Sequence, residues 1–276
     1  MAATDKIGAV MVVGGGISGL QSALDLADSG FKVYLVEKQP SIGGAMAQLD
    51  KTFPTNDCAM CIMAPKLVAT GRHHNIDLIT NADIVKVDGQ EGNFTVTGKQ
   101  RALRVDASKC TGCGSCAQKC PIETTDEYNE NTKVRKAIFV KYPQAVPLVY
   151  SIDPEKCIGC GICAEECKAD AVEYDQKEKD FEIKVGSIIV SPGFDEFDAK
   201  LKAEYGYGVY QNVVSSIEFE RILSATGPHF GTVMRPSDGD IPEKIAFIQC
   251  VGSRDEKVGN ESVSYTHLTL PTTPYV

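Results

Sequence analysis

Two cysteine runs with the same spacing constrain this chain more than any other feature of its sequence. The first is C-x2-C-x2-C-x3-C from Cys110 to Cys120, and the second repeats these intervals from Cys157 to Cys167. With this spacing, three thiolates bind corners of one cubane while the fourth points away and ligates the other cluster. The sequence therefore predicts an α+β, ferredoxin-like segment that holds two 4Fe-4S clusters.

This crossed arrangement assigns four ligands to each cluster. The first set is Cys110, Cys113, Cys116 and Cys167, and the second is Cys157, Cys160, Cys163 and Cys120. Zinc is the competing metal, but tetrahedral zinc sites are built from pairs of thiolates at longer separation, which neither run resembles. Lys168 stands where proline normally follows the second run, and the runs lie farther apart than in compact ferredoxins. The pairing of the sets therefore stays more open than the identity of the ligands.

A glycine-rich turn near the N-terminus predicts a dinucleotide site. Residues 7–13 (IGAVMVV) form a continuous apolar run typical of a buried strand, and apolar residues at helical spacing follow the glycines. Between them, Gly14, Gly16 and Gly19 permit a tight turn, close backbone approach to a pyrophosphate, and helix packing. Glu37 ends the next strand, where a carboxylate accepts ribose hydroxyls. Together these features favour a bound dinucleotide over a glycine turn without a ligand.

We expect FAD rather than NAD at this turn. The turn lies close to the N-terminus, and the pair Gly43-Gly44 follows Glu37. This arrangement resembles the flavoproteins with two dinucleotide domains, of the glutathione and thioredoxin reductase type, in which FAD is the N-terminal ligand. The later segment SIIVSPGFD resembles the strand that touches the flavin side of their site, which adds Gly193, although Ser-Pro stands where those proteins usually have Ala-Thr.

The cysteine block interrupts an α/β pattern. Before it, short strands between residues 76 and 105 (IDLIT, DIVKV and NFTVT) predict a small antiparallel ribbon, and after it FEIKV leads into the buried-strand signature SIIV. We therefore expect an α/β, Rossmann-like FAD-binding domain of the thioredoxin reductase type, in two parts at 1–105 and 177–262, with the ferredoxin-like insert at 106–176. Residues 263–276 are expected to be a non-native tail, which implies a truncated fragment.

Charge and composition exclude other classes. A net charge of −9 argues against a nucleic-acid-binding surface, so we expect protein partners. No stretch approaches the roughly 20 apolar residues of a membrane-spanning helix, so direct membrane insertion is not expected. Eleven cysteines without an export signal favour metal or redox chemistry over a disulfide framework, because a reducing cytosol keeps thiols free. The expected location is therefore the cytoplasm.

The pair Cys58-x2-Cys61 stays open at this point. It fits a redox pair, extra cluster ligands, or two buried structural thiols, and a thioredoxin-like role needs a helix N-terminus that lowers a thiol pKa. Cys250 by itself is typical of a core cysteine.

Several segments together resemble the A-subunits of heterodisulfide reductases over residues 7 to about 257. They are VGGGISGLQSALDLADSGFKVYLVEK, LDKTFPTNDCAMCIMAPK, KCTGCGSCAQKCP with the later YPQAVPLVY, and EYGYGVYQNVVSSIEFERILSATGP with the later IAFIQCVGSRDE. The resemblance implies an oxidoreductase with FAD and ferredoxin clusters. It also implies a cytoplasmic complex with two other heterodisulfide reductase subunits and an electron-input hydrogenase or formate dehydrogenase.

The resemblance further implies flavin-based electron bifurcation, in which one electron of a pair goes to ferredoxin and the other toward a disulfide. That disulfide is reduced on a different polypeptide, so no catalytic residue is expected in this chain. Cys250 would be the first ligand of a further cluster. The rival functions are the flavoprotein component of a quinone-linked oxidoreductase in sulfate respiration and an electron-transfer module that turns over no substrate. The small component of a glutamate-synthase-like enzyme fits less well, because there the ferredoxin region precedes the first dinucleotide fingerprint.

Overall fold

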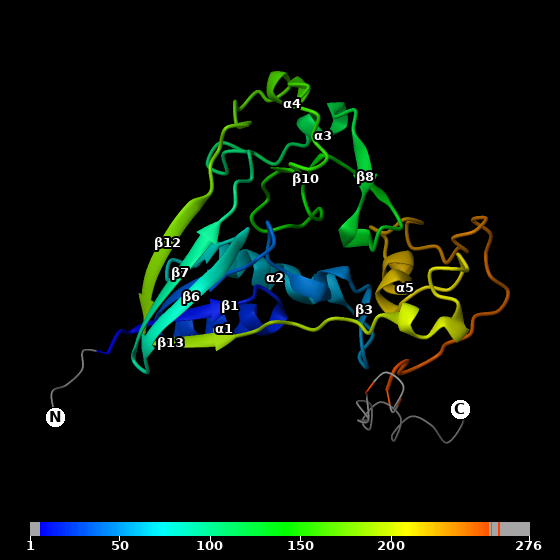
Figure 1. Ribbon diagram of the computed structural model, residues 1–276, viewed down its shortest axis with the longest axis horizontal. Coiled ribbons are helices and arrows are strands. Elements are labelled where there is room, and N and C mark those ends of the chain that lie inside the picture. Colours follow the sequence, from blue (N-terminus) through cyan, green and yellow to red (C-terminus); the bar gives the residue numbers. More distant parts are fainter. Residues whose placement is uncertain (1–5, 254, 256–258, 260–276) are drawn as a thin grey trace. The chain divides into compact units, whose positions relative to one another are not determined.

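The computed structural model describes residues 6–253, 255 and 259 (Figure 1). The chain divides into two compact units between Gly193 and Phe194. The tail expected at 263–276 lies outside the described residues. Within the described part of the chain, no helix combines the length and the apolar character needed to cross a bilayer.

A parallel sheet is the centre of the first unit. Its strand order is β13-β1-β2-β5, with all neighbouring pairs parallel. The strands are β1 (Ala9–Val13), β2 (Lys32–Val36), β5 (Ile76–Ile79) and β13 (Ser187–Val190). The crossovers from β1 to β2 and from β2 to β5 contain α1 (Ile17–Asp28) and α2 (Ala59–Arg72). This confirms the α/β class and the predicted β-α-β start.

A three-stranded antiparallel ribbon packs on the sheet. It has the order β12-β7-β6 and consists of β6 (Ala82–Gln90), β7 (Asn93–Gln100) and β12 (Lys179–Val185), which lie side by side in Figure 1. One expectation was wrong, because IDLI was assigned to this ribbon. It forms β5 instead, since α2 returns the chain to the free edge of β2, where Val33 pairs with Ile76.

The two faces of β1 enter different hydrophobic clusters. Val12 packs with Leu20 and Met63 from the helices, whereas Met11 packs with Val96 and Val185 from the ribbon. These side chains are completely buried. The alternation of side chains along a strand thus produces three layers, with helices on one face of the parallel sheet and the ribbon on the other.

The cysteine-rich segment leaves the ribbon after β7 and returns at β12, which is the strand that pairs with β7. It is therefore inserted into the α/β fold. Its elements are α3 (Ser115–Lys119), α4 (Ile162–Glu165), η2 (Glu127–Asn129), the hairpin of β8 (Glu123–Thr125) and β9 (Val134–Lys136), and the pair of β10 (Ile138–Phe139) and β11 (Ser151–Ile152). The fold is α+β, as expected.

The internal repeat of the insert is visible in its backbone. Gly112 and Gly159 have φ angles of 68° and 69°, and Gly114 and Gly161 both have 84°. The last two are the N-caps of α3 and α4. Positions with a left-handed backbone favour glycine, because a residue with a Cβ is strained there, and these positions correspond between the two cysteine runs.

A short segment connects β2 with α2. It contains the 3-10 helix η1 (Gly44–Gln48) and a two-stranded hairpin of β3 (Lys51–Thr52) and β4 (Asp57–Cys58). Cys58 therefore ends a strand and directly precedes α2.

The second unit contains η3 (Ala199–Leu201), η4 (Ala203–Tyr205) and α5 (Ser216–Leu223). A capping box of Ser215 and Glu218 starts α5. The segment expected to continue the flavoprotein domain, 177–262, thus contributes β12 and β13 to the first unit and continues into the second. The bounds of the expected domains stay a prediction.

Candidate dinucleotide and iron-sulfur sites

The glycines of the turn after β1 differ in the space around them. Gly14 has φ +104°, and a Cβ there would lie 2.0 Å from the Ser191 carbonyl oxygen. A Cβ on Gly19 would lie 1.9 Å from the Gly14 carbonyl oxygen. A Cβ on Gly16 would meet nothing within 4 Å. Gly14 and Gly19 are thus required for the turn and for helix packing, whereas Gly16 leaves open space at the start of α1.

The N-terminus of α1 has free donor capacity. Gly16 is its N-cap, no side chain caps the helix, and the first turn contains no acidic residue. The first amide groups of a helix lack intrahelical acceptors, and the helix dipole favours an anion beside them. The start of α1 therefore has the chemistry of a phosphate site.

The carboxylate of Glu37 is buried beside this turn. Its Oε2 accepts a hydrogen bond from the Gly15 amide at 2.6 Å, and its Oε1 accepts one from the Gln39 amide at 2.8 Å. Both oxygens retain lone pairs that can accept a further hydroxyl hydrogen bond. Glu37 thus supports the glycine turn in addition to the ribose role expected from the sequence.

The pair Gly43 and Gly44 packs on the turn. The Gly43 amide donates to the Gly15 carbonyl oxygen at 2.8 Å, and a Cβ on Gly44 would lie 2.9 Å from the Gly16 Cα. Both residues have positive φ, as does Gly193. The structure does not bring Gly193 into comparably close packing, because a Cβ there would meet nothing within 4 Å.

Sequence reasoning missed that the connector between the cysteine runs contacts this turn. The Tyr142 hydroxyl donates to the Ile42 carbonyl oxygen, the Ile42 amide donates to the Val146 carbonyl oxygen at 2.9 Å, and the Tyr142 ring stacks on Tyr128. Lys141 precedes Tyr142; burial lowers the pKa of its ammonium group, while Glu37 opposes this shift. No pattern in the sequence predicts these contacts, because they join segments about 100 residues apart.

Each set of four cysteines lines its own cavity in the insert. The first cavity is lined by Cys110, Cys113, Cys116 and Cys167. The second is lined by Cys157, Cys160, Cys163 and Cys120. Ile138 of β10 lines both, so the cavities are neighbours. The fold thus brings the fourth cysteine of each run to the first three of the other.

The cysteine side chains have different surroundings. Burial raises the pKa of Cys116 to about 11 and also raises the pKa of Cys163. The pKa of Cys113 is lowered, mainly by a hydrogen bond from the Ser115 amide and also by one from the Ser115 hydroxyl. Because a thiol must lose its proton to bind iron, cluster binding would release protons from thiols such as Cys116 and Cys163, the pKa of which is raised.

Several groups surround the sulfurs as donors. The Gly159 amide donates to the Cys157 sulfur and the Ala171 amide to the Cys167 sulfur, each at 3.4 Å. The Tyr174 hydroxyl lies 3.0 Å from the Cys163 sulfur, a contact that the sequence did not signal. Hydrogen bonds to the sulfurs are one of the means by which proteins set cluster potentials.

The described residues contain no group of three or more His, Cys, Asp or Glu side chains close enough to hold a single metal ion. Thiolates around one zinc ion would lie about 3.8 Å apart, since each Zn–S bond is about 2.3 Å. A cubane is wider, because each thiolate binds a different iron corner. In its donor set, each cavity offers four cysteine thiols, the number of ligands that a 4Fe-4S cluster takes.

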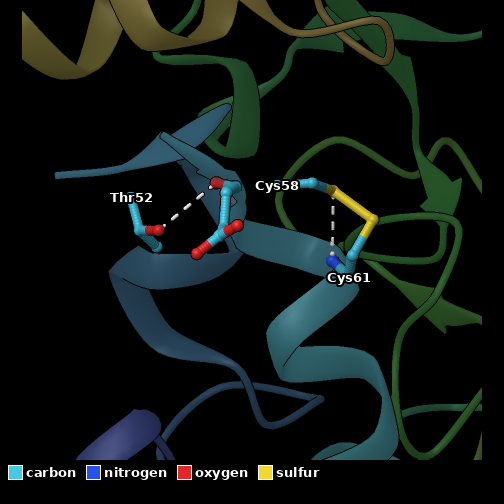
Figure 2. Close-up of a disulfide and its surroundings, with 4 residues drawn as sticks. Thr52, Cys58 and Cys61 are labelled. Atoms are coloured by element: carbon cyan, nitrogen blue, oxygen red, sulfur yellow. Dashed lines mark hydrogen bonds between the residues drawn. A yellow bond between two sulfur atoms is a disulfide. The ribbon is translucent and has the colours of Figure 1, made fainter. Parts of the chain in front are cut away.

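The remaining cysteines lie elsewhere. Cys58 and Cys61 form a disulfide at the start of α2, with Cys61 exposed, so they are not buried structural thiols (Figure 2). Cys250 is a partly exposed free cysteine in the second unit.

Comparison with known proteins agrees with both parts of the first unit. The family model for the 4Fe-4S dicluster domain matches residues 109–172, and the model for the NAD(P)-binding Rossmann-like domain matches residues 12–66. The insert is thus an iron-sulfur domain. Solved structures resemble the chain only weakly; thioredoxin reductase of Lactococcus lactis is 11% identical with a TM-score of 0.29, covering 72% of this chain and 81% of its own.

Curated relatives match nearly the whole chain. The A-subunit of the H(2)/formate:CoB-CoM heterodisulfide,ferredoxin reductase of Methanococcus maripaludis is 61% identical over 91% of this chain and 38% of its own length. The iron-sulfur A-subunit of the CoB–CoM heterodisulfide reductase of Methanocaldococcus jannaschii is 55% identical over 92% of this chain and 39% of its own. The chain thus spans about two fifths of the length of these relatives. Over about nine tenths of its own length, the chain is closely similar to the A-subunits of heterodisulfide reductases.

Proposed function

We propose that this chain is the FAD-binding and iron-sulfur electron-transfer part of a heterodisulfide-reductase-type oxidoreductase. The observation that carries the proposal is the pair of neighbouring four-cysteine cavities, each made from both cysteine runs, in one compact unit with a phosphate-type helix N-terminus. A dinucleotide cofactor alone does not require eight such thiols.

In this proposal the dinucleotide is FAD, with its pyrophosphate at the start of α1. The open space at Gly16 and the uncapped helix support this placement. Glu37 would accept the ribose hydroxyls, while Gly14, Gly19, Gly43 and Gly44 would keep the turn close enough for its amides to reach phosphate oxygens. The flavin would exchange electron pairs when bound, and Gly193 would border its other side.

Two 4Fe-4S clusters would occupy the insert. Cys110, Cys113, Cys116 and Cys167 would hold one, and Cys157, Cys160, Cys163 and Cys120 the other, which the lining of the two cavities supports. Clusters carry single electrons, whereas flavin carries pairs, so the combination can split pairs.

A short segment of the chain connects the insert with the dinucleotide turn. Ile138 borders both cavities, and four residues later Tyr142 packs on Ile42 and Gly43. These four residues span at most about 14 Å of extended chain. The connector would thus keep the cluster sites close to the turn.

The proposed activity is flavin-based electron bifurcation between a reduced donor, ferredoxin and a disulfide. The relatives' names refer to H2, formate, ferredoxin and a CoB-CoM heterodisulfide. Partners would be the other subunits of such a complex with a hydrogenase or formate dehydrogenase. The proposal places the protein in the cytoplasm, because thiols that serve as cluster ligands must stay reduced.

Coupled turnover tests this function. The complete complex containing this sequence should be purified without oxygen and supplied with a reduced donor, ferredoxin and heterodisulfide. We expect ferredoxin reduction only while heterodisulfide is present. Ferredoxin reduction at the same rate without heterodisulfide would contradict bifurcation and favour a simple electron conduit, and reduction of quinone instead would favour the rival of sulfate respiration.

A further inference from the structure

The cysteine pair at the start of α2 is separate from the cluster sites. Cys58 and Cys61 are joined by a disulfide, and neither lines the cavities of the two cluster sets. Cys61 is exposed and Cys58 is partly exposed. Figure 2 shows the disulfide at the first turn of the helix. A thiol compound in solution can therefore reach the Cys58–Cys61 disulfide bond.

The backbone around Cys58 stabilises a thiolate. Cys58 is the N-cap of α2, and its sulfur accepts a hydrogen bond from the Cys61 amide at 3.2 Å (Figure 2). The helix has 14 residues and no acidic residue in its first turn. An amide donor and the positive end of a helix dipole favour the thiolate over the thiol.

The hairpin before the helix adds a cation. Lys51 of β3 pairs directly with Cys58 of β4, and side chains opposite each other in an antiparallel pair lie on the same face. The Thr52 hydroxyl donates to the Asp57 carbonyl oxygen at 3.3 Å, which helps to close the hairpin. The exposed Asp57 carboxylate lies on the opposite face of the strand, since neighbouring residues alternate.

We propose that Cys58 and Cys61 form a thiol-disulfide exchange site that reacts with organic disulfides, a function beyond the flavin and cluster chemistry above. In the reduced pair, the Cys58 thiolate attacks one sulfur of a disulfide RS–SR′, forming a Cys58–SR mixed disulfide and releasing R′S⁻, which takes up a proton. Cys61 then loses its proton and attacks the Cys58 sulfur, releasing RS⁻. The pair loses two electrons, and the two substrate sulfurs gain them.

Trapping the mixed disulfide tests this site. The protein is reduced anaerobically with dithiothreitol, freed of reductant, exposed to glutathione disulfide, alkylated and analysed by peptide mass. In Cys61→Ser, we expect glutathione to accumulate on Cys58 at least tenfold faster than on Cys250 of the same molecules. In Cys58→Ser, Cys61 should react several-fold more slowly than Cys58 does in Cys61→Ser. Serine is a good N-cap residue, so this second variant keeps the helix start.

Two controls make the result specific. Lys51→Gln in the Cys61→Ser background should slow the reaction of Cys58, whereas Lys179→Gln, an exposed strand lysine elsewhere, should not. Iron content should equal that of the unmodified protein in both cysteine variants. Loss of iron would overturn the proposal in favour of cluster ligands, and equal rates at Cys58 and Cys250 would overturn it in favour of an inert disulfide. Failure of the flavin or cluster assays alone would leave these rates unaffected, which separates the two proposals.

Discussion

Replacement of Gly16 by alanine separates cofactor binding from the stability of the fold. A Cβ at Gly16 meets nothing within 4 Å, and its φ of −74° is open to any residue. The folded protein without cofactor should therefore lose at most about 1 kcal/mol of its free energy of unfolding, a loss that comes from alanine being a poorer N-cap than glycine. The added methyl group, however, would stand where a pyrophosphate has to approach the first amides of α1.

The expected loss of affinity follows from the hydrogen bond that is displaced. A hydrogen bond to a charged group contributes about 1.5–3 kcal/mol. Since each 1.4 kcal/mol changes a dissociation constant tenfold, Gly16→Ala should weaken FAD binding by about 10- to 150-fold. Flavin is removed, the protein is titrated with FAD, and the quenching of flavin fluorescence gives the dissociation constant.

Two further glycine variants complete this experiment. Gly8→Ala adds a methyl group to an exposed glycine before β1, also with nothing within 4 Å, and should change neither stability nor affinity. Gly19→Ala should instead destabilise the protein by about 1–3 kcal/mol, because its Cβ would lie 1.9 Å from a backbone oxygen. Unchanged FAD affinity in Gly16→Ala, with normal stability, would refute the placement of the pyrophosphate.

Three other predictions concern the surroundings of the turn. Glu37→Gln should lower the free energy of unfolding without cofactor by about 1–3 kcal/mol in urea titrations, because the side-chain NH2 of glutamine replaces one carboxylate oxygen and leaves the Gly15 or the Gln39 amide without an acceptor; no loss would contradict the buried contact. Tyr142→Phe should cost about 1 kcal/mol in the same assay, since the Ile42 carbonyl oxygen loses its donor, whereas Tyr210→Phe at an exposed site should cost nothing measurable. Burial lowers the pKa of Lys141 in the folded state, so the unfolded chain binds more protons between that pKa and about 10.4. Stability should therefore rise with pH through this window relative to Lys141→Met, and parallel urea midpoints of the two proteins between about pH 8 and 10.5 would contradict the shift.

The parts of the fold that follow local rules could be predicted from the sequence. An apolar run before glycines and apolar residues at helical spacing predicted β1 and α1, because these patterns report which faces are buried. The cysteine intervals predicted two sets of four thiols, since the spacing reflects the geometry of a ligand rather than of a neighbouring segment.

The parts that depend on distant segments could not be predicted in this way. The strand at Ile76–Ile79 was assigned to the ribbon, because a short apolar strand does not reveal which edge it joins. The Tyr142 hydrogen bond to Ile42 joins residues 100 positions apart, and neither has a distinctive neighbour sequence. Burial of β13 was also overestimated, since Val190 is 65% exposed although its apolar run resembles a central strand.

The central claim is that eight cysteines of the insert hold two cubane clusters. The most direct test is the amount of iron and acid-labile sulfide per chain in anaerobically purified protein. We expect about eight of each, as two 4Fe-4S clusters require. Little iron, or zinc in its place, would contradict the claim and leave a dinucleotide-binding domain with a structural metal site.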